Sequence, residues 1–391
     1  MRSIAAPAQK IAGRKGMARS EGLRKAKRHG VLPLGPFIAA LLVGCSGEEW
    51  TDAVTAMPEP VTEAAAPALD REALRARALA VFGTLPTEAS NPENTVTAAK
   101  VELGRLLYYD PRLSKNHDIS CNTCHLLDRH CVDGQPTSSG HRGQRGGRNA
   151  PTVYNAALHI AQFWDGRAAD VEEQAKGPIL NPIEMAMPSE EAVLAVLESI
   201  PDYAPLFAAA FPEDESSITY DNMARAIGAF ERKLLTPSPF DAFIAGDDSA
   251  FSDEQLAGLD AFVSAGCIAC HQGAAIGGGL YQKLGVIKPY PTEDPGRVEI
   301  TGNEADRQVF KVPSLRNITK TAPYLHDGSI QRLDEMIRIL AEYQPGIPVD
   351  DAQVSAIHAF LGSLTGTVDA ELIAKPTLLP SGPDTPAPDP S

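Results

Sequence analysis

The feature that most constrains this chain is a short pattern that occurs twice. Two cysteines lie two residues apart and a histidine directly follows, at Cys121-Asn122-Thr123-Cys124-His125 and Cys267-Ile268-Ala269-Cys270-His271. This spacing is typical of c-type haem attachment, in which the two thiols form thioethers with the haem vinyl groups. The next residue then lies under the porphyrin and supplies the proximal iron ligand. The sequence therefore predicts two covalently attached haems, with His125 and His271 as iron ligands.

Zinc sites and thiol redox sites also use cysteines separated by two residues. Zinc is disfavoured because a histidine directly follows each pair and because Cys124 and Cys267 are 143 residues apart. A thioredoxin-like site would need a βαβ pattern, which the sequence lacks. Cys131 stands outside both motifs, and we interpret it as a small buried apolar side chain.

The first 44 residues have the character of a targeting segment. Nine Lys and Arg side chains precede an apolar run, Val31 to Val43, that is too short to span a bilayer. The run ends in Leu42-Val43-Gly44-Cys45-Ser46, which resembles the lipobox of bacterial lipoproteins, where the cysteine is acylated. We expect a periplasmic protein, lipid-anchored to the outer membrane through Cys45. An ordinary secretory signal remains the alternative, and the start is Met1 or Met17.

The charge of the remaining chain is strongly negative. Residues 1–44 carry nine basic side chains and one acidic one, out of 35 and 50 in the whole chain. The remainder therefore has 26 basic and 49 acidic side chains, a net charge of −23. Such a surface repels nucleic acid phosphates, which excludes that class of partner. It favours a positively charged soluble partner, which would be attracted by electrostatic steering.

Apolar periodicity predicts helices, and no segment alternates as a strand would. The helices are predicted over residues 98–109, 189–200, 221–235, 252–266, 332–341 and 351–364. Between the first two, residues 126–151 form a long loop rich in Gly and Arg, and such loops are usually functional. The predicted fold class is mainly α, with two c-type cytochrome domains that each hold one covalently attached haem.

Proline-rich and polar stretches divide the chain into five parts. Residues 45–70 have a composition typical of a flexible tether, and Thr236-Pro237-Ser238-Pro239 is the strongest domain boundary. The predicted parts are the targeting segment 1–44, the tether 45–70, an N-terminal haem domain 71–236, a C-terminal haem domain 237–366, and an extended Pro-rich tail 367–391.

Residues from about 95 to 365 resemble the bacterial dihaem cytochrome c peroxidases and the related dihaem oxidases. The likeness extends beyond the haem motifs to four further segments: Asp133 to His141, Phe163-Trp164-Asp165-Gly166-Arg167, Glu173 to Pro178 with Ile183-Glu184-Met185, and Thr321-Ala322-Pro323-Tyr324-Leu325-His326. The resemblance implies that the first haem is the peroxidatic one and that the second haem receives electrons.

The resemblance assigns roles around the first haem. His141 matches the family histidine that closes the distal side in the resting oxidised form and leaves when the other haem is reduced. Glu184 matches the carboxylate that moves a proton between the peroxide oxygens, first as base and then as acid. Gln174 matches the amide that hydrogen-bonds the bound peroxide, and Trp164 a residue between the haems that relays electrons.

At the second haem the family pattern is broken. The family's other axial ligand is a methionine, which raises the reduction potential. Counting from the Thr321 segment places Leu340 at that position, and leucine cannot bind iron. Met336 and Tyr343, each about one helical turn away, remain as candidate ligands. The third alternative is a five-coordinate haem with no sixth ligand. A shift of the alignment by one turn would also explain the mismatch.

The resemblance also implies a calcium ion between the haem domains and a homodimer. Asn149 matches a calcium ligand, and backbone carbonyls of Thr321 and Pro323 would complete the set, since Ca²⁺ prefers hard oxygen ligands. The predicted function is reduction of hydrogen peroxide with electrons from a small cytochrome c or cupredoxin. The alternatives are a dihaem oxidase that acts on a partner protein and a non-catalytic electron carrier.

Overall fold

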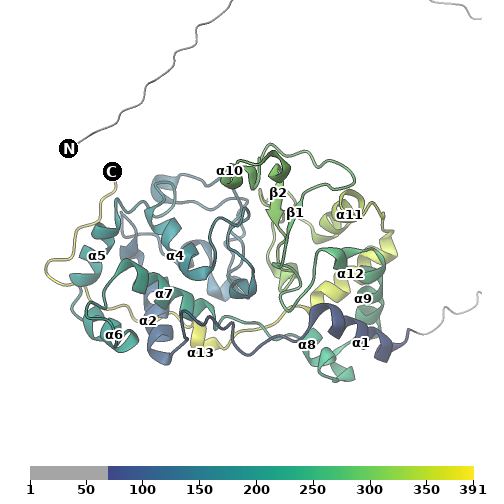
Figure 1. Ribbon diagram of the computed structural model, residues 1–391, viewed down its shortest axis with the longest axis horizontal. Helices are drawn as coiled ribbons and strands as arrows, with labels where there is room; N and C mark the ends of the chain where they lie inside the picture. The colour runs from purple at the N-terminus through teal and green to yellow at the C-terminus, as the bar shows by residue number, and fades with distance from the viewer. Residues whose placement is uncertain (1–68) are drawn as a thin grey trace, which may run out of the picture. The chain divides into compact units, whose positions relative to one another are not determined.

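Helices account for most of the regular structure in residues 69–391, the part of the chain that this computed structural model describes (Figure 1). The α-helices are α1 (Arg71–Phe82), α2 (Ala98–Tyr109), α3 (Cys121–Cys124), α4 (Val171–Leu180), α5 (Glu190–Glu198), α6 (Tyr203–Ala210), α7 (Tyr220–Glu231), α8 (Pro239–Ile244), α9 (Asp253–Ser264), α10 (Val298–Thr301), α11 (Leu333–Tyr343), α12 (Asp351–Ser363) and α13 (Ala370–Ile373). The predicted class, mainly α, is confirmed. The predicted targeting segment, Cys45 and most of the tether lie outside the described residues.

Short 3-10 turns and one small sheet connect these helices. The turns are η1 (Pro111–Leu113), η2 (Leu127–Arg129), η3 (His141–Gly143), η4 (Ala156–Leu158), η5 (Asp248–Ala250), η6 (Cys267–Ala269), η7 (Glu304–Asp306) and η8 (Ile318–Lys320). Within residues 69–391 the only sheet is the antiparallel pair β1 (Tyr281–Lys283) and β2 (Val309–Lys311). The sequence predicts no strand, because three residues are too few to show an alternating pattern.

Side-chain caps set the helix ends where the sequence predicts them. Thr97 accepts a hydrogen bond from the backbone of Lys100 and starts α2, which ends before Asp110 as predicted. A capping box of Ser252 and Gln255 starts α9, also as predicted. Helix α7 is shorter than predicted, because it ends at Glu231 and not at residue 235.

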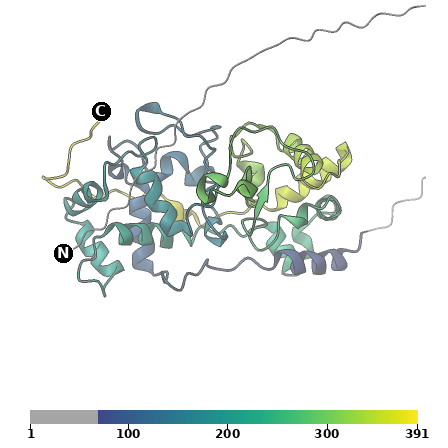
Figure 2. The ribbon, with the colours of Figure 1, turned by 45° about the horizontal axis from the view of Figure 1, so that its top comes forward.

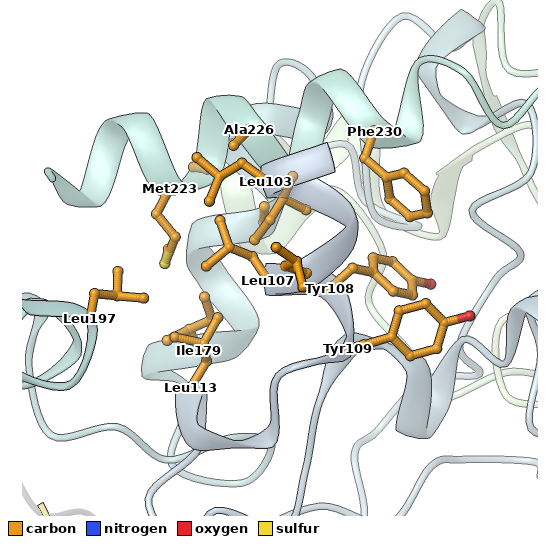
Figure 3. Close-up of a cluster of buried hydrophobic side chains, with 14 of the residues drawn as sticks. Leu103, Leu107, Tyr108, Tyr109, Leu113, Ile179, Leu197, Met223, Ala226 and Phe230 are labelled. Carbon is orange, nitrogen blue, oxygen red and sulfur yellow. The ribbon is translucent and has the colours of Figure 1, made fainter. Parts of the chain in front are cut away.

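The first core forms where α2 crosses α7, with α4, α5 and α6 around the crossing (Figure 3). A side chain at Gly104 would clash with the carbonyl group of Ala226, so glycine allows the two helices to touch. The largest wholly buried side chains of this core are Leu103, Leu107, Tyr108, Leu113, Leu127, Tyr203, Phe207 and Phe230.

The second core repeats this arrangement with α9 and α12. A side chain at Gly258 would clash with the carbonyl group of Ala356 and the Cβ atom of Phe360. A side chain at Gly104 would clash in the same way with Ala226 and Phe230 in the first core. In each core the glycine-bearing helix precedes a haem motif in the chain. The aromatic side chains at the centre of the second core are Phe82, Phe240, Phe243, Phe251, Phe262 and Phe360.

Two terminal segments pack against the core that is distant in sequence. Helix α1 belongs to the second core, and Figure 2 shows it beside the green and yellow helices. The predicted N-terminal domain 71–236 includes this helix, but Phe82 packs edge-on against Phe240 at 5.5 Å between ring centroids. Half-buried Leu372, Leu378 and Leu379 of the tail contact the first core instead. Burial of apolar side chains decides both positions.

All of the described residues belong to one compact unit. Within them no single helix has the length and apolar content needed to cross a membrane, although α5 and α6 pass that test as a pair with a 110° bend between them.

Candidate haem and peroxide site

The first haem motif forms the short helix α3. A capping box of Ser120 and Thr123 starts the helix, and His125 follows its last residue. The hydroxyl of Tyr108 donates to the backbone oxygen of His125 at 2.9 Å, which fixes the histidine next to the first core. Burial lowers the pKa of the His125 imidazole, and its Nδ1 atom is buried without a hydrogen-bond partner. A neutral imidazole has a free nitrogen lone pair, which is what an iron ligand requires.

The second motif places its histidine in an equivalent environment. Cys267 begins η6 and His271 follows Cys270. The Nδ1 atom of His271 lies 3.3 Å from the backbone oxygen of Ile276, which leaves Nε2 for a metal. Burial lowers the pKa of His271 to about 4, so this imidazole is also neutral. Both motifs therefore fit the role of a proximal haem ligand.

The zinc alternative has no support within residues 69–391. No group of three or more His, Cys, Asp or Glu side chains converges there as a metal site would require. Cys131 is fully buried, as predicted for a small apolar side chain.

The buried pair of Lys311 and His159 also fits a haem. Lys311 Nζ lies 3.0 Å from Nδ1 of His159, and burial lowers the pKa of Lys311 to about 8. His159 Nε2 is buried without a partner. The propionate groups of a haem would supply the negative charge and the acceptor that this pair lacks. No local sequence pattern indicated this pair, because the two residues are 152 positions apart.

His141 and Glu184 are brought together by backbone contacts. The backbone N–H of His141 donates to the carbonyl of Glu184 at 2.8 Å, and Gly140 lies so close to Ile183 and Glu184 that a side chain there would clash. Burial raises the pKa of the Cys124 thiol, and the charges of Asp133 and Glu184 add to this shift.

The carboxyl group of Glu184 is oriented and partly desolvated. Asn181 Nδ2 donates to Glu184 Oε1 at 2.7 Å. Burial raises the pKa of Glu184, while Arg167 and Asn181 oppose this shift. An acid whose pKa is moved toward neutrality suits proton transfer in both directions.

Gln174 lies on α4, in the helix that leads to the Glu184 turn. Its side chain is half-buried, and within residues 69–391 it forms no hydrogen bond to His141 or Glu184. The structure therefore joins Glu184 and His141 by a hydrogen bond in which Gln174 takes no part.

Trp164 links two segments that are far apart in sequence. Its Nε1 donates to the backbone oxygen of Asn149 at 2.9 Å, and its own carbonyl accepts from the N–H of Lys311 at 2.7 Å. The ring of His326 lies edge-on at 6.4 Å between centroids. His326 in turn stacks on Phe310 at 4.5 Å. The indole is thus fixed within a chain of aromatic rings.

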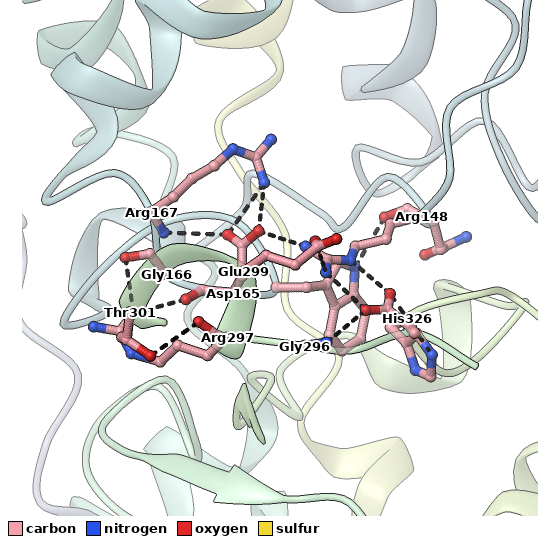
Figure 4. Close-up of polar contacts among 12 residues, drawn as sticks. Arg148, Asp165, Gly166, Arg167, Gly296, Arg297, Glu299, Thr301 and His326 are labelled. Carbon is pink, nitrogen blue, oxygen red and sulfur yellow. Dashed lines mark hydrogen bonds and ion pairs between the residues drawn. The ribbon is translucent and has the colours of Figure 1, made fainter. Parts of the chain in front are cut away.

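An ion-pair network surrounds these rings (Figure 4). Arg148 binds Asp294 with two nitrogens at 2.7 and 2.8 Å, and it also donates to Asp165. Arg297 donates to the backbone oxygen of Asp165 at 2.7 Å. The side chain of Asp165 is only 3% exposed, so its charge is compensated by Arg148 and Arg167 and not by water. The predicted sites did not include this network.

Asn149 lies beside the segment that contains Thr321 and Pro323. Its backbone N–H donates to the carbonyl of His326 at 2.6 Å, and its Nδ2 donates to the carbonyl of Gln135 at 2.9 Å. These bonds leave the side-chain oxygen of Asn149 as a candidate ligand. Calcium binding by the three residues remains a prediction.

Helix α11 presents two sets of side chains near the second core. Leu333 and Met336 are buried in that core, whereas Ile337 and Leu340 are half-buried against it. Tyr343 lies beside Tyr290, with 5.5 Å between ring centroids, and Lys288 Nζ lies 4.4 Å from its ring centre. Leu340 therefore packs as an apolar side chain, and the sixth ligand of the second haem remains a prediction.

Residues 98–249 match a family model described as di-haem cytochrome c peroxidase. The cytochrome c551 peroxidase of Nitrosomonas europaea is 47% identical over 304 residues, which are 77% of this chain and 89% of the relative. The chain belongs to the di-haem cytochrome c peroxidase family. The predicted family and enzyme class are thus confirmed, and membership together with two attachment motifs gives the chain two c-type haems.

The family also contains relatives with another name. The methylamine utilization protein MauG of Methylophilus methylotrophus is 33% identical over 299 residues, 72% of this chain and 86% of the relative. Among solved structures, a MauG-like protein associated with microbial copper homeostasis has a TM-score of 0.67 and 29% identity, and the match covers 78% of this chain and 97% of that one. This di-haem peroxidase therefore has relatives with both names.

Proposed function

We propose that this di-haem peroxidase reduces hydrogen peroxide to two waters with two electrons and two protons, at the first haem. The observation that carries the proposal is the half-buried Glu184, held against the backbone of His141 near Cys124. A pure electron carrier has no need of an acid–base group there, which disfavours that alternative.

The protein's own groups would handle the proton. The haem supplies the electrons and the iron at which peroxide binds. The Glu184 carboxylate would take the proton from the nearer peroxide oxygen and return it to the departing oxygen, which leaves as water. Asn181 holds one carboxylate oxygen at 2.7 Å, so the other is available to the substrate. Gln174 would orient the peroxide from α4.

Electrons would enter at the second haem and pass through the region of Trp164. The fixed contacts of its indole with Asn149 and its edge-on approach to His326 support a positioning or relay role between the two halves. Asn149, Thr321 and Pro323 would hold a calcium ion there. The donor would be a small cytochrome c or cupredoxin whose positive face matches the acidic surface.

We also propose a periplasmic location, with a lipid anchor at Cys45, and a homodimer. The net charge of −23 that remains without residues 1–44 supports a soluble cationic donor. Two domains, 71–236 and 237–366, would each hold one haem, with α1 and the tail 367–391 packed on the opposite cores.

The Glu184→Gln variant tests this function. We expect peroxide reduction with a reduced donor to fall by about 10²–10⁴-fold, because the amide keeps the shape but cannot accept the proton. Stopped-flow oxidation of the donor measures it. Glu173→Gln on the exposed side of α4 is the matched control and should keep normal turnover. Undiminished turnover in Glu184→Gln would refute the assignment.

A second candidate is a di-haem oxidase that acts on a partner protein. Leu340 favours it, because the expected methionine is absent, and so does the 33% identity to MauG. Steady peroxide turnover with a small donor favours the peroxidase. Slow peroxide consumption together with oxidation of a protein substrate favours the oxidase.

A further inference from the structure

The C-terminal stretch 375–391 follows a defined path across the first core. Figure 1 shows it as the yellow coil that passes α6 and α5. Leu378 and Leu379 pack against the core, and Ser381 accepts from Arg112 at 3.1 Å. Farther along, Thr385 and Ser199 share a hydrogen bond of 2.9 Å at the end of α5. These spaced contacts fix the direction of the segment.

The last residues reach the turn that contains Glu184 and Met185. Lys115 donates its backbone N–H to the carbonyl of Met185 at 2.8 Å, so it is fixed directly beside that turn. The carbonyl of Lys115 accepts from the N–H of Asp389 at 2.9 Å, and the two side chains form an ion pair at 3.4 Å. Lys115 Nζ also donates to the backbone oxygen of Ser391 at 2.9 Å and to its hydroxyl at 3.0 Å.

At this point the segment meets the predicted distal ligand. His141 Nε2 lies 3.0 Å from the backbone oxygen of Ser391, and the His141 side chain is only 5% exposed. That oxygen can only accept a hydrogen bond, so Nε2 must carry the proton. A protonated Nε2 has no free electron pair for iron. The contact and iron ligation through the same nitrogen therefore exclude each other.

We propose that residues 375–391 form a strap that holds His141 off the iron of the first haem, so that the oxidised protein already presents an open site to peroxide. This inference rests on the proposed function, since it assigns His141 to the same site. It differs from the family behaviour that the resemblance implies, in which the oxidised resting form is closed by this histidine. The strap would make prior reduction of the second haem unnecessary, which agrees with the loss of the methionine at Leu340.

The test is the spin state of the first haem in the oxidised holoprotein, read by electron paramagnetic resonance and optical spectroscopy. We expect a high-spin first haem in the unchanged protein. The combined variant Lys115→Ala with Asp389→Ala should convert it to a low-spin haem with two histidine ligands. Loss of a hydrogen bond to a charged group corresponds to a population shift of roughly tenfold or more.

Three further variants make the result specific. Removal of residues 386–391 should have the same effect as the combined variant. Adding His141→Ala to that deletion should restore the high-spin signal. Asp384→Ala, an exposed change within the same segment, should leave the spectrum unchanged.

The outcomes also separate the strap from the proposed function. A low-spin first haem in the unchanged oxidised protein, or no spectral change on deletion, would overturn the strap even if peroxide is reduced. The expected spectral changes in a protein that does not reduce peroxide would support the strap and reject the peroxidase. Activity that requires prior reduction only after deletion would support both.

Discussion

Glu231 is a carboxyl group in the first core that the proposed reaction does not use. It lies at the end of α7, 4% exposed, near the buried ion pair of Glu172 and Arg232. Burial raises its pKa to about 8, and the charge of Glu172 adds to the shift. Arg232 opposes the shift, but its Nε and one of its terminal nitrogens both donate to the Glu172 carboxylate, each at 2.7 Å.

This single residue makes stability depend on pH. The folded protein holds the Glu231 proton more tightly than the unfolded chain does, so its contribution is complete below pH 4.5 and is lost as pH rises to about 8. Each unit of pKa shift corresponds to about 1.4 kcal/mol. We expect the contribution of Glu231 to the free energy of unfolding to fall by a few kcal/mol across that interval. Urea unfolding of the holoprotein at several pH values measures it.

Glu231→Gln is the corresponding variant. The amide cannot ionise, so the unfolding free energy should depend less steeply on pH in this interval. Glu198→Gln, on exposed α5, should keep the dependence of the parent. Equal slopes in Glu231→Gln and the parent would show that this carboxyl group does not titrate as proposed.

At the scale of elements, α11 carries the residues among which the sixth ligand of the second haem is predicted. Its buried side chains, Leu333 and Met336, belong to the second core, and Leu340 lies one turn beyond Met336 on the half-buried side. A thioether at position 340 would therefore replace an apolar contact rather than an existing ligand.

The Leu340→Met variant tests this placement. A methionine ligand raises the reduction potential of a c-type haem, so the second haem should titrate at a higher potential than in the parent. A spectroelectrochemical titration measures both haems separately. Met336→Leu should leave the potential unchanged. A fall in potential with Met336→Leu would instead identify Met336 as the ligand, and no change in Leu340→Met would mean that position 340 does not face the iron.

At the scale of the whole molecule, segments from opposite halves of the sequence hold one another. Helix α1 packs with the second core and the tail packs with the first core. Arg148 joins Asp165 to Asp294, and these two acids are 129 residues apart. The haem regions are therefore fixed by crossing contacts and not only by the Pro-rich boundary at residues 236–239.

Removal of the Arg148 charge should loosen this arrangement. Arg148→Met leaves Asp294 without its arginine and Asp165 with Arg167 alone, and we expect a loss of roughly 3 kcal/mol, because the largely buried charge of Asp294 becomes uncompensated. Arg338→Met, which breaks a solvent-exposed pair with Asp351, should cost about 1 kcal/mol or less. Denaturant unfolding followed at the haem absorbance compares the two. Equal losses would argue against a structural role of the Arg148 network.

The sequence by itself determined the chemistry and much of the local structure. The spacing of Cys121 to His125 and of Cys267 to His271 predicts haem attachment, because that bond depends on adjacent residues. The ends of α2 and the capping box of α9 could also be predicted from the sequence, because a helix cap depends only on neighbouring residues. Glu184 and His141 could be named only through resemblance to a family.

The tertiary structure alone decided which distant segments meet. His141 and Ser391 are 250 residues apart, Lys311 and His159 are 152 apart, and α1 packs on the core formed by the far half of the chain. No local period encodes such contacts, because they depend on burial of apolar surface and pairing of buried charge across the whole fold. The sequence thus specifies what is attached at each site, and the fold decides what each site can touch.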